Sequence, residues 1–217
     1  MWVEDHFGET LCQGCAGGPP CWSCEAVTGG TGARARTVLA DGRVRCARCS
    51  RSAVDRQSDV GGVVALVRPL LHSYGISLPN RVRVSLAGPA GLTLGGQAVH
   101  GLTRVVQFGR SARVVSLEVV SGLPATGFGR VLAHEMAHAW LARCPGTRSA
   151  AVEEGTCELV GSWWLAHRGG PLAEHLLRGM AESPDPLYGK GYRDVARRAR
   201  GLAPAQVVRR VEATGAV

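Results

Sequence analysis

The sequence predicts an α+β fold in two parts, residues 1–50 and residues 51–217. Three C-x-x-C pairs lie in the first 50 residues, which contain few long apolar runs. The remainder shows apolar residues at helical spacing, then β-like stretches, then helical spacing again. With 217 residues, 45% of them hydrophobic, the chain is long enough for one sizeable domain and a small appendage.

The second part is expected to be a short sheet combined with helices. Apolar spacing favours a helix over residues 60–73. Stretches of β-like composition follow at 81–86, 99–108 and 112–120, and the turns between them favour a two- or three-stranded, mostly antiparallel sheet. Further helices are expected at 126–144 (with Thr126 as its N-cap), 149–167, 171–180, 192–200 and 204–211.

Four cysteines have the spacing of a structural zinc site. Cys21-x2-Cys24 and Cys46-x2-Cys49 are separated by 21 residues, and four thiolates in this pattern typically close around zinc. The intervening residues predict a β-hairpin with its turn at 41–42. Because a region this small cannot bury much core, a metal would have to stabilise it.

The other cysteines give weaker signals. Cys12 and Cys15 could form a further partial zinc site with His6, or could remain free of metal. Cys144 and Cys157 stand alone and are expected to be small buried residues. The N-terminus lacks the features of a secretory signal, and thiolate zinc sites suit a reducing compartment, so we expect a cytoplasmic protein.

The segment His134-Glu135-Met136-Ala137-His138 is the strongest functional signal. Residues four apart on a helix share one face, so His134 and His138 can present two imidazoles to one zinc ion. A catalytic zinc site keeps one position open for water. Glu135 would flank the ion as the general base that takes a proton from that water. The predicted reaction is therefore the hydrolysis of peptide bonds.

A third protein ligand has to come from another segment. We expect Glu154, which lies 16 residues after His138 (154 − 138) and directly before Gly155, where a missing side chain would relieve crowding at the site. Glu158 is either a carboxylate behind the ligands or a rival ligand, and Glu153 is the least favoured of the three.

Groups that contact the substrate are less certain from the sequence. Tyr188 and Tyr192 are candidates for donating a hydrogen bond to the developing oxyanion, although either could serve only in packing. The strand expected at 112–120 could bind an extended substrate by β-augmentation.

These motifs together resemble a known family. Residues 132–141 (LAHEMAHAWL) and 152–157 (VEEGTC) closely resemble the peptidase domain of plant LIM-domain peptidases, which restrain organ growth and are activated by ubiquitin. Residues 20–24 and 41–49 resemble the cysteine module before that domain, and residues 183–193 and 213–215 resemble its C-terminal segment. The resemblance implies a gluzincin-like zinc endopeptidase acting on protein substrates, with His134, His138 and Glu154 as ligands and Glu135 as base.

The chain also departs from the plant pattern. Plant members carry ubiquitin-interacting motifs and a complete LIM domain upstream, whereas residues 2–15 resemble only the tail of a LIM finger. The composition, rich in Arg and Ala, fits a short bacterial relative. We therefore do not expect ubiquitin to be its activator.

Single features of the sequence suggest two other functions. The cysteine module could recruit a protein partner while the HExxH domain remains non-catalytic. The net charge of +8 could indicate nucleic acid, but the arginines are spread along the chain without interleaved aromatic residues, so nucleic acid is not expected. No apolar run reaches 18 residues, so no membrane span is expected.

Overall fold

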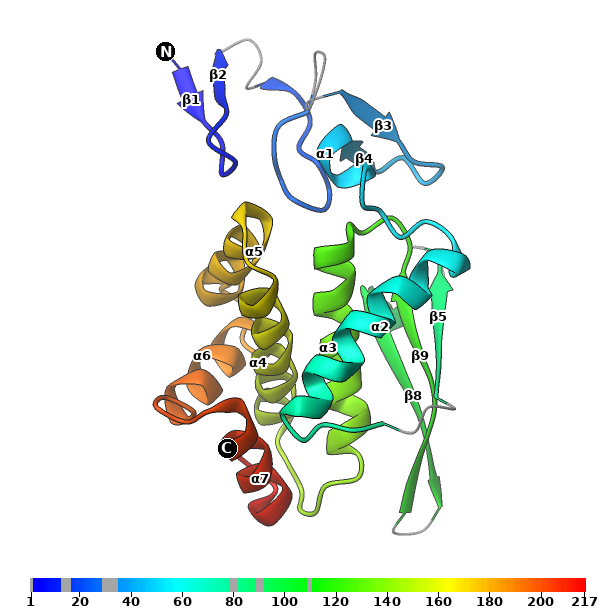
Figure 1. Cartoon of the computed structure of the whole chain (residues 1–217), viewed down its shortest axis with the longest axis vertical. Coiled ribbons are helices and arrows are strands. Elements are labelled where there is room, and N and C mark those ends of the chain that lie inside the picture. Colours follow the sequence, from blue (N-terminus) through cyan, green and yellow to red (C-terminus); the bar gives the residue numbers. More distant parts are fainter. Residues whose placement is uncertain (1, 13–16, 29–34, 79–81, 89–91, 109–110) are drawn as a thin grey trace.

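The computed structural model describes residues 2–12, 17–28, 35–78, 82–88, 92–108 and 111–217. The cysteine-rich N-terminal residues lie at one end of the molecule, and a sheet with the longer helices forms the remainder (Figure 1). The mixture of helices, small sheets and four clustered cysteines is compatible with the α+β prediction. Within the described residues, no helix is both long and apolar enough to cross a bilayer.

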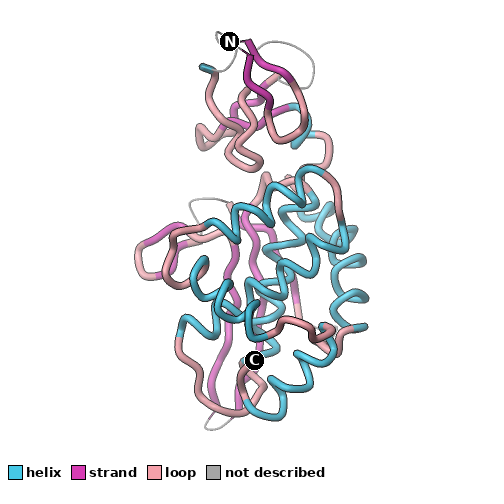
Figure 2. The backbone as a smooth tube through the Cα atoms, turned by 90° about the vertical axis from the view of Figure 1, so that its left-hand side faces the viewer, coloured by secondary structure: helices cyan, strands magenta, loops and turns pink. Residues whose placement is uncertain are grey.

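A mixed three-stranded sheet forms the framework of the larger part. β8 (Gly101–Phe108) and β9 (Ser111–Val120) pair antiparallel and extend along the length of this part (Figure 2). β5 (Arg83–Ala87) pairs with the other edge of β9 in parallel. The antiparallel pairing is as expected, but the parallel edge strand was not. It arises because the chain between β5 and β8 crosses the C-terminal end of β9, so that the two outer strands run in opposite directions.

A β-bulge in β9 changes which of its side chains face the core. Arg104 pairs with Ser116 and Val105 pairs with Val114, so Val115 has no partner across the strand. Val115 is 49% exposed, whereas Leu117 and Val119 beyond the bulge are fully buried. One extra residue reverses the alternation of a strand, which explains why 112–120 is rich in β-branched residues without a clean period of two.

The expected long helices are all present with shifted ends. α2 (Gln57–Ser73) and α3 (Ala125–Leu141) pack on the sheet, and α4 (Ala150–Arg168) packs along α3. α5 (Pro171–Glu182) and α6 (Gly189–Arg198) contact α4, and α7 (Pro204–Thr214) ends the chain. Several short elements were not expected, namely β1 (Trp2–Glu4), β2 (Thr10–Cys12), α1 (Ala47–Ser50), β6 (Thr93–Leu94) and β7 (Gln97–Ala98).

The N-cap of α3 is Pro124, so the expectation of Thr126 is wrong. The backbone of Pro124 forms an isolated bridge with Ala53, and the Ala125 N–H donates to the Ser52 carbonyl oxygen at 2.7 Å. These contacts with the preceding linker fix where the helix begins. Thr126 is instead a helical residue whose carbonyl oxygen accepts a hydrogen bond from the Trp164 indole at 2.9 Å.

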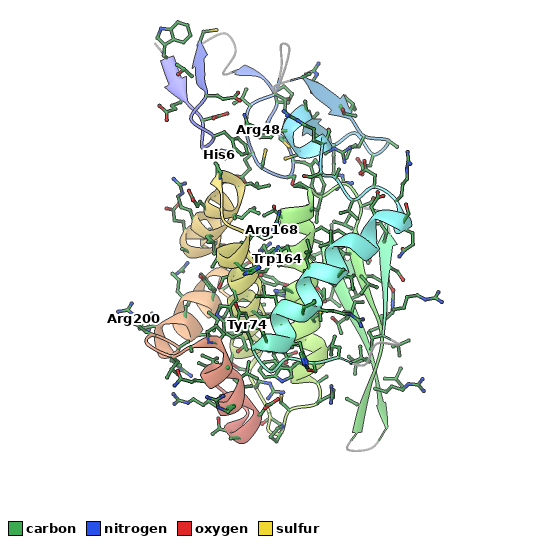
Figure 3. All side chains as sticks on the ribbon, in the orientation of Figure 1. His6, Arg48, Tyr74, Trp164, Arg168 and Arg200 are labelled. Atoms are coloured by element: carbon green, nitrogen blue, oxygen red, sulfur yellow. The ribbon has the colours of Figure 1, made fainter. Side chains whose placement is uncertain are left out.

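Close packing of α3 and α4 depends on Gly129. A Cβ at this position would lie 2.3 Å from the ring of Trp164, which α4 contributes to the core. Figure 3 shows the labelled Trp164 inside the helical layer, whereas Arg200 points outward from the surface. The missing side chain of Gly129 therefore makes room for the largest buried residue of the interface.

Gly155 brings α4 into backbone contact with α6. A Cβ at position 155 would lie 2.3 Å from the carbonyl oxygen of Gly191. The expectation that Gly155 relieves crowding beside Glu154 is therefore wrong. Consecutive helical residues point about 100° apart, so Glu154 and Gly155 face different neighbours.

The N-terminal part contains the expected hairpin. β3 (Arg36–Val38) and β4 (Val44–Cys46) pair antiparallel, and the turn between them places Gly42 at a φ of 83°. Asp41 Oδ1 accepts a hydrogen bond from the Arg43 N–H at 3.0 Å, which closes the turn.

Arg45 connects this hairpin to the rest of the molecule. It is 5% exposed and donates to both carboxylate oxygens of Asp55, at 2.7 and 2.9 Å. It also donates to the Gly122 carbonyl oxygen at 3.2 Å. The hydrogen bonds from Arg45 lower the pKa of Asp55. The buried Arg45 thus links the two parts through an ion pair with Asp55, whose side chain is 46% exposed.

Replacing Arg45 with methionine should reduce the free energy of unfolding by roughly 2–3 kcal/mol, because the Asp55 carboxylate and the Gly122 carbonyl lose a shared donor. Chemical denaturation measures the change. Arg36→Met, at an exposed position of β3, is the matched control and should change stability by less than about 0.5 kcal/mol. Equal effects of the two substitutions would contradict the role given to Arg45.

Replacing Gly155 with alanine should destabilise the fold by roughly 1–3 kcal/mol, because the added methyl group forces α6 away from α4. Gly179→Ala in α5 is the control, since a Cβ there meets nothing within 4 Å. That change should stabilise by roughly 0.5–1 kcal/mol through helix propensity. Denaturation curves that show the same sign for both variants would refute the close helix contact.

Candidate metal centre

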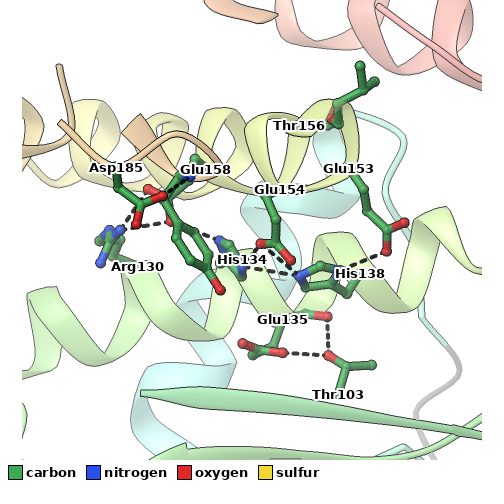
Figure 4. A network of polar contacts seen from close by, with 12 residues as sticks. Thr103, Arg130, His134, Glu135, His138, Glu153, Glu154, Thr156, Glu158 and Asp185 are labelled. Carbon is green, nitrogen blue, oxygen red and sulfur yellow. Dashed lines mark hydrogen bonds and ion pairs between the residues drawn. The ribbon is translucent and has the colours of Figure 1, made fainter. Parts of the chain in front are cut away.

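Two helices bring three donor atoms together (Figure 4). α3 carries His134 and His138, and Glu154 of α4 lies opposite their rings. The Nε2 atoms of the two histidines lie 3.1 Å apart. Glu154 Oε2 lies 3.3 Å from His134 Nε2 and 3.4 Å from His138 Nε2. The three atoms form a nearly equilateral triangle.

This triangle has the size that three ligands of one zinc ion would give. With Zn–N and Zn–O distances of about 2.1 Å, tetrahedral ligand atoms lie about 3.4 Å apart. Glu154 Oε2 is buried and has no hydrogen-bond partner among the described residues. A buried, unsatisfied carboxylate oxygen is costly, and a cation bound by His134, His138 and Glu154 would satisfy it.

The Nδ1 atoms of the same histidines contact two other carboxylates. His134 Nδ1 lies 3.0 Å from Glu158 Oε1, and His138 Nδ1 lies 3.2 Å from Glu153 Oε1. Such contacts fix the tautomer and the orientation of metal-binding histidines. The geometry thus favours Glu154 over Glu158 as a ligand and places Glu153 and Glu158 behind the rings.

The ionisation of these groups is strongly coupled. Burial would raise the pKa of Glu154, but its contacts with His134 and His138 lower it to about 2. Burial would lower the pKa of His134, but Glu154 and Glu158 raise it above its usual value. The pKa of His138 is also raised, against burial, by its contacts with Cys157 and the carboxylates.

Glu135 lies beside the two histidines and is held by the sheet. Its Oε2 accepts a hydrogen bond from Thr103 Oγ1 of β8 at 2.7 Å. The neighbouring Gly101 makes room for it, since a Cβ there would lie 2.4 Å from Glu135 Oε1. Neither Thr103 nor Gly101 is signalled by the sequence, because only the pairing of α3 with β8 brings them to the site.

A groove of about 860 Å³ contains these groups. Its lining includes residues 97–103 around the start of β8, together with His134, Glu135, His138 and Tyr188. Tyr188 lies near His134, and 6.2 Å separate the centroids of the two rings. Tyr192 is not among the lining residues and packs against the hydrophobic core instead.

The strand that borders the groove is β8. The sheet order β5-β9-β8 makes β9 the central strand, and β5 occupies its second edge over residues 116–120. No residue of β9 is among the described residues that line the groove, so the structure gives no support to the expectation that 112–120 binds substrate by β-augmentation. A hydrophobic strand often occupies the centre of a sheet, and its sequence does not reveal how many neighbours it has.

Two cysteines lie closer to the site than the sequence indicated. Cys157 is fully buried, as expected, but its thiol belongs to a cluster with the ring nitrogens of His134 and His138, all within 4.8 Å of one another. Burial raises its pKa to about 12, which disfavours the thiolate form that binds metal. Cys144 is only partly buried and lines the groove, in contrast to the expectation of a buried residue.

The second metal-binding cluster consists of four buried cysteines, and their sulfur atoms lie within 4.8 Å of one another. The Cys24 and Cys46 sulfurs are 3.7 Å apart, close to the spacing of about 3.8 Å for tetrahedral thiolates on zinc. Contact with Cys24 and the other thiols lowers the pKa of Cys21. The cluster is Cys21, Cys24, Cys46 and Cys49.

The possible third site is only partly described. Cys15 lies outside the described residues, and Cys12 belongs to β2. The ring of His6 stacks on His175 of α5, with 3.8 Å between the ring centroids. His6 thus contacts the larger part of the molecule.

Comparison with known proteins identifies the family of the chain. A family model described as "DA1-like: Protein DA1" matches residues 67–183, more than half of the chain. The chain belongs to the DA1-like family. The resemblance to plant LIM-domain proteins seen in the sequence is thereby confirmed.

Three plant relatives illustrate the match. Protein DA1 of Arabidopsis thaliana is 36% identical over 72 residues, which are 32% of this chain and 13% of that protein. Protein DA1-related 7 of the same plant is 28% identical over 189 residues, 69% of this chain and 33% of that protein. LIM domain-containing protein HDR3 of Oryza sativa subsp. japonica is 41% identical over 58 residues, which are 26% of this chain and 11% of that protein.

The matches therefore span a third or less of the length of these relatives. No solved structure matches the chain significantly.

Zinc binding at the histidine site should strengthen as the pH rises. The carboxylates raise the pKa of His134, and Cys157 together with the carboxylates raises the pKa of His138, so protons compete with zinc for both rings at higher pH than for an ordinary histidine. Between about pH 6 and about pH 8 we expect affinity to rise about tenfold or more. Competition with a chromophoric chelator measures it, and the His134→Ala variant identifies the ion concerned. A constant affinity over this range would contradict the coupling.

Proposed function

We propose that this chain is a zinc-dependent endopeptidase that hydrolyses peptide bonds in protein substrates. The observation that carries the proposal is the convergence of His134, His138 and Glu154 beside an open groove, with Glu135 next to them. Three protein ligands and a free position are typical of catalytic zinc sites, whereas structural sites are closed by four.

A zinc ion held there would supply Lewis-acid chemistry, polarising a carbonyl group and making water a nucleophile at neutral pH. Glu135 would take the proton from the attacking water and pass it to the leaving amine. The hydrogen bond from Thr103 holds one carboxylate oxygen, so the other remains free for this transfer. Glu135 is 5% exposed, so little of its surface is accessible to solvent.

Tyr188 is the proposed donor to the oxyanion. It precedes α6, and its turn is fixed by Asp185, whose Oδ1 accepts hydrogen bonds from the N–H groups of Leu187 and Tyr188 at 2.8 Å each. A rigid turn that carries a hydroxyl group beside the metal ligands suits charge stabilisation in a groove. Tyr192 has no such placement, so we assign it no catalytic role.

The exposed edge of β8 is the proposed support for the substrate backbone. The Val120 N–H donates to the His100 carbonyl oxygen at 2.8 Å, so His100 directs its backbone groups toward β9. Backbone direction alternates along an antiparallel strand, so Gly101 and Thr103 direct theirs toward the open edge. An extended peptide could pair with these two residues and would then pass beside the Glu135 carboxylate.

We further propose that the four-cysteine cluster binds a second, structural zinc ion. Four thiolates leave no open position, and the surrounding residues have little core of their own. In this view residues 1–50 form a zinc module and residues 51–217 form the peptidase domain. Because reduced thiols are needed, we propose a cytoplasmic location.

Replacing Glu135 with glutamine should lower kcat for hydrolysis of an unfolded protein substrate by about a thousandfold or more, because the amide cannot accept the proton. The zinc content should remain at two ions per chain. Glu182→Gln, at an exposed end of α5, is the matched control and should keep full activity. Turnover in Glu135→Gln equal to wild type, or no turnover by wild type with both ions bound, would favour a non-catalytic adaptor instead.

A further inference from the structure

We propose that Arg130 is a positioning residue of the histidine zinc site. Acting through Glu158, it would hold the His134 ring with Nε2 directed at the ion. This inference rests on the proposed zinc site and adds a residue that acts on the ion through Glu158 and His134.

A continuous chain of contacts carries the proposal (Figure 4). Arg130 Nη2 donates to Glu158 Oε1 at 2.9 Å and to Oε2 at 2.7 Å. The same Oε1 lies 3.0 Å from His134 Nδ1. Arg130 and His134 are four residues apart on α3, so they share one face. Glu158 reaches both from α4 and bridges them.

The burial of Glu158 makes its contact with Arg130 important. The Glu158 side chain is 6% exposed, so solvent contributes little to stabilising its charge. Arg130 is the cation that compensates it. With the carboxylate maintained, Glu158 accepts a hydrogen bond from the Nδ1–H of His134, and the lone pair of Nε2 remains free for the metal.

The other contacts of Arg130 point to the same role. Its Nε atom is buried and has no hydrogen-bond partner among the described residues. The guanidinium lies between the main groove and a second cavity of about 250 Å³ that reaches Ser23 and Glu25 of the N-terminal part. Burying an unsatisfied donor there is unfavourable, so the pair with Glu158 is the interaction that accounts for an arginine at this position.

The second histidine offers an internal comparison. His138 Nδ1 contacts Glu153, whose side chain is 42% exposed. Water can solvate that carboxylate, so it needs no buried cation. The zinc site should therefore be sensitive to the charge behind His134 and much less sensitive to the charge behind His138.

The test is a double-mutant cycle on the full chain with zinc as the probe. Affinity of the histidine site is measured by chelator competition for Arg130→Gln, Glu158→Gln, the double variant, Arg130→Lys, the comparison variant Glu153→Gln and the control Glu182→Gln, which lies at an exposed position of α5. We expect Arg130→Gln and Glu158→Gln to bind zinc about 10- to 100-fold more weakly. Arg130→Lys keeps the charge and should lose less than about fivefold. Glu153→Gln should lose less affinity than Glu158→Gln, and Glu182→Gln should bind zinc as the wild type does. The double variant should be no weaker than the weaker single variant, because the two residues act in series.

Two results would overturn the proposal. One is an unchanged zinc affinity in Arg130→Gln, and the other is fully additive losses in the double variant. The melting temperature and the zinc held by the four cysteines report whether each variant is folded. If Arg130→Gln does not fold, near-normal affinity in Arg130→Lys with a loss in Glu158→Gln still supports the proposal, and the opposite pattern overturns it.

Failure of the underlying site has a different signature. If His134→Ala retains both zinc ions, the proposed zinc site itself is wrong. If His134→Ala loses one ion while Arg130→Gln binds zinc normally, only the role of Arg130 is wrong.

Discussion

The close packing of α4 along α3 is the constraint on which the candidate site depends. The two histidines and Glu135 belong to α3, whereas Glu153, Glu154 and Glu158 belong to α4. Gly129 leaves room for Trp164, and a Cβ at Gly161 would lie 3.3 Å from the Arg130 carbonyl oxygen. Sites of this kind tolerate displacements of only about 0.5 Å. Small residues at the helix interface therefore determine whether three donor atoms can meet at one ion.

Charge balance links the site to its surroundings. Glu135 and Glu158 are each 5% exposed, and the Glu154 side chain is 18% exposed. Three carboxylates beside one arginine leave two negative charges to be compensated in a poorly solvated region. One divalent cation supplies that charge, and so do two protonated histidines. Protons and metal are therefore alternative ways of neutralising the same set of carboxylates. These carboxylates raise the pKa of His134, and together with Cys157 they raise the pKa of His138.

The sequence predicts the features that depend on local spacing. The i, i+4 histidines, the Cys21/Cys24 and Cys46/Cys49 pairs and the Asp41-Gly42 turn require only neighbouring residues, and each has the expected local geometry. Features that depend on distant packing were missed. Thr103 reaches Glu135 only because β8 borders α3, and the centre of the sheet is occupied by β9 only because the chain crosses its end.

The role of Arg130 can be predicted from the sequence only in part. Its spacing of four residues from His134 is visible in the sequence, but the meaning of that spacing depends on Glu158, which only the packing of α4 supplies. The same holds for Gly155: its place beside Glu154 suggested a role at the site, whereas the structure shows that it meets Gly191 of α6. A motif gives residue types and order, but the partner of each side chain comes from the tertiary fold.

The N-terminal part contacts the segments that precede α3 and β8. Arg43 and Arg45 donate to the carbonyl oxygens of Ser121 and Gly122, in the turn just before α3. The Trp22 ring packs at that turn and lies 5.9 Å from the ring of His100, just before β8. α3 and β8 carry Glu135 and the Thr103 that holds it. The contacts of Arg43, Arg45 and Trp22 thus connect the region of the four cysteines with the segments that lead into the two elements of the histidine site.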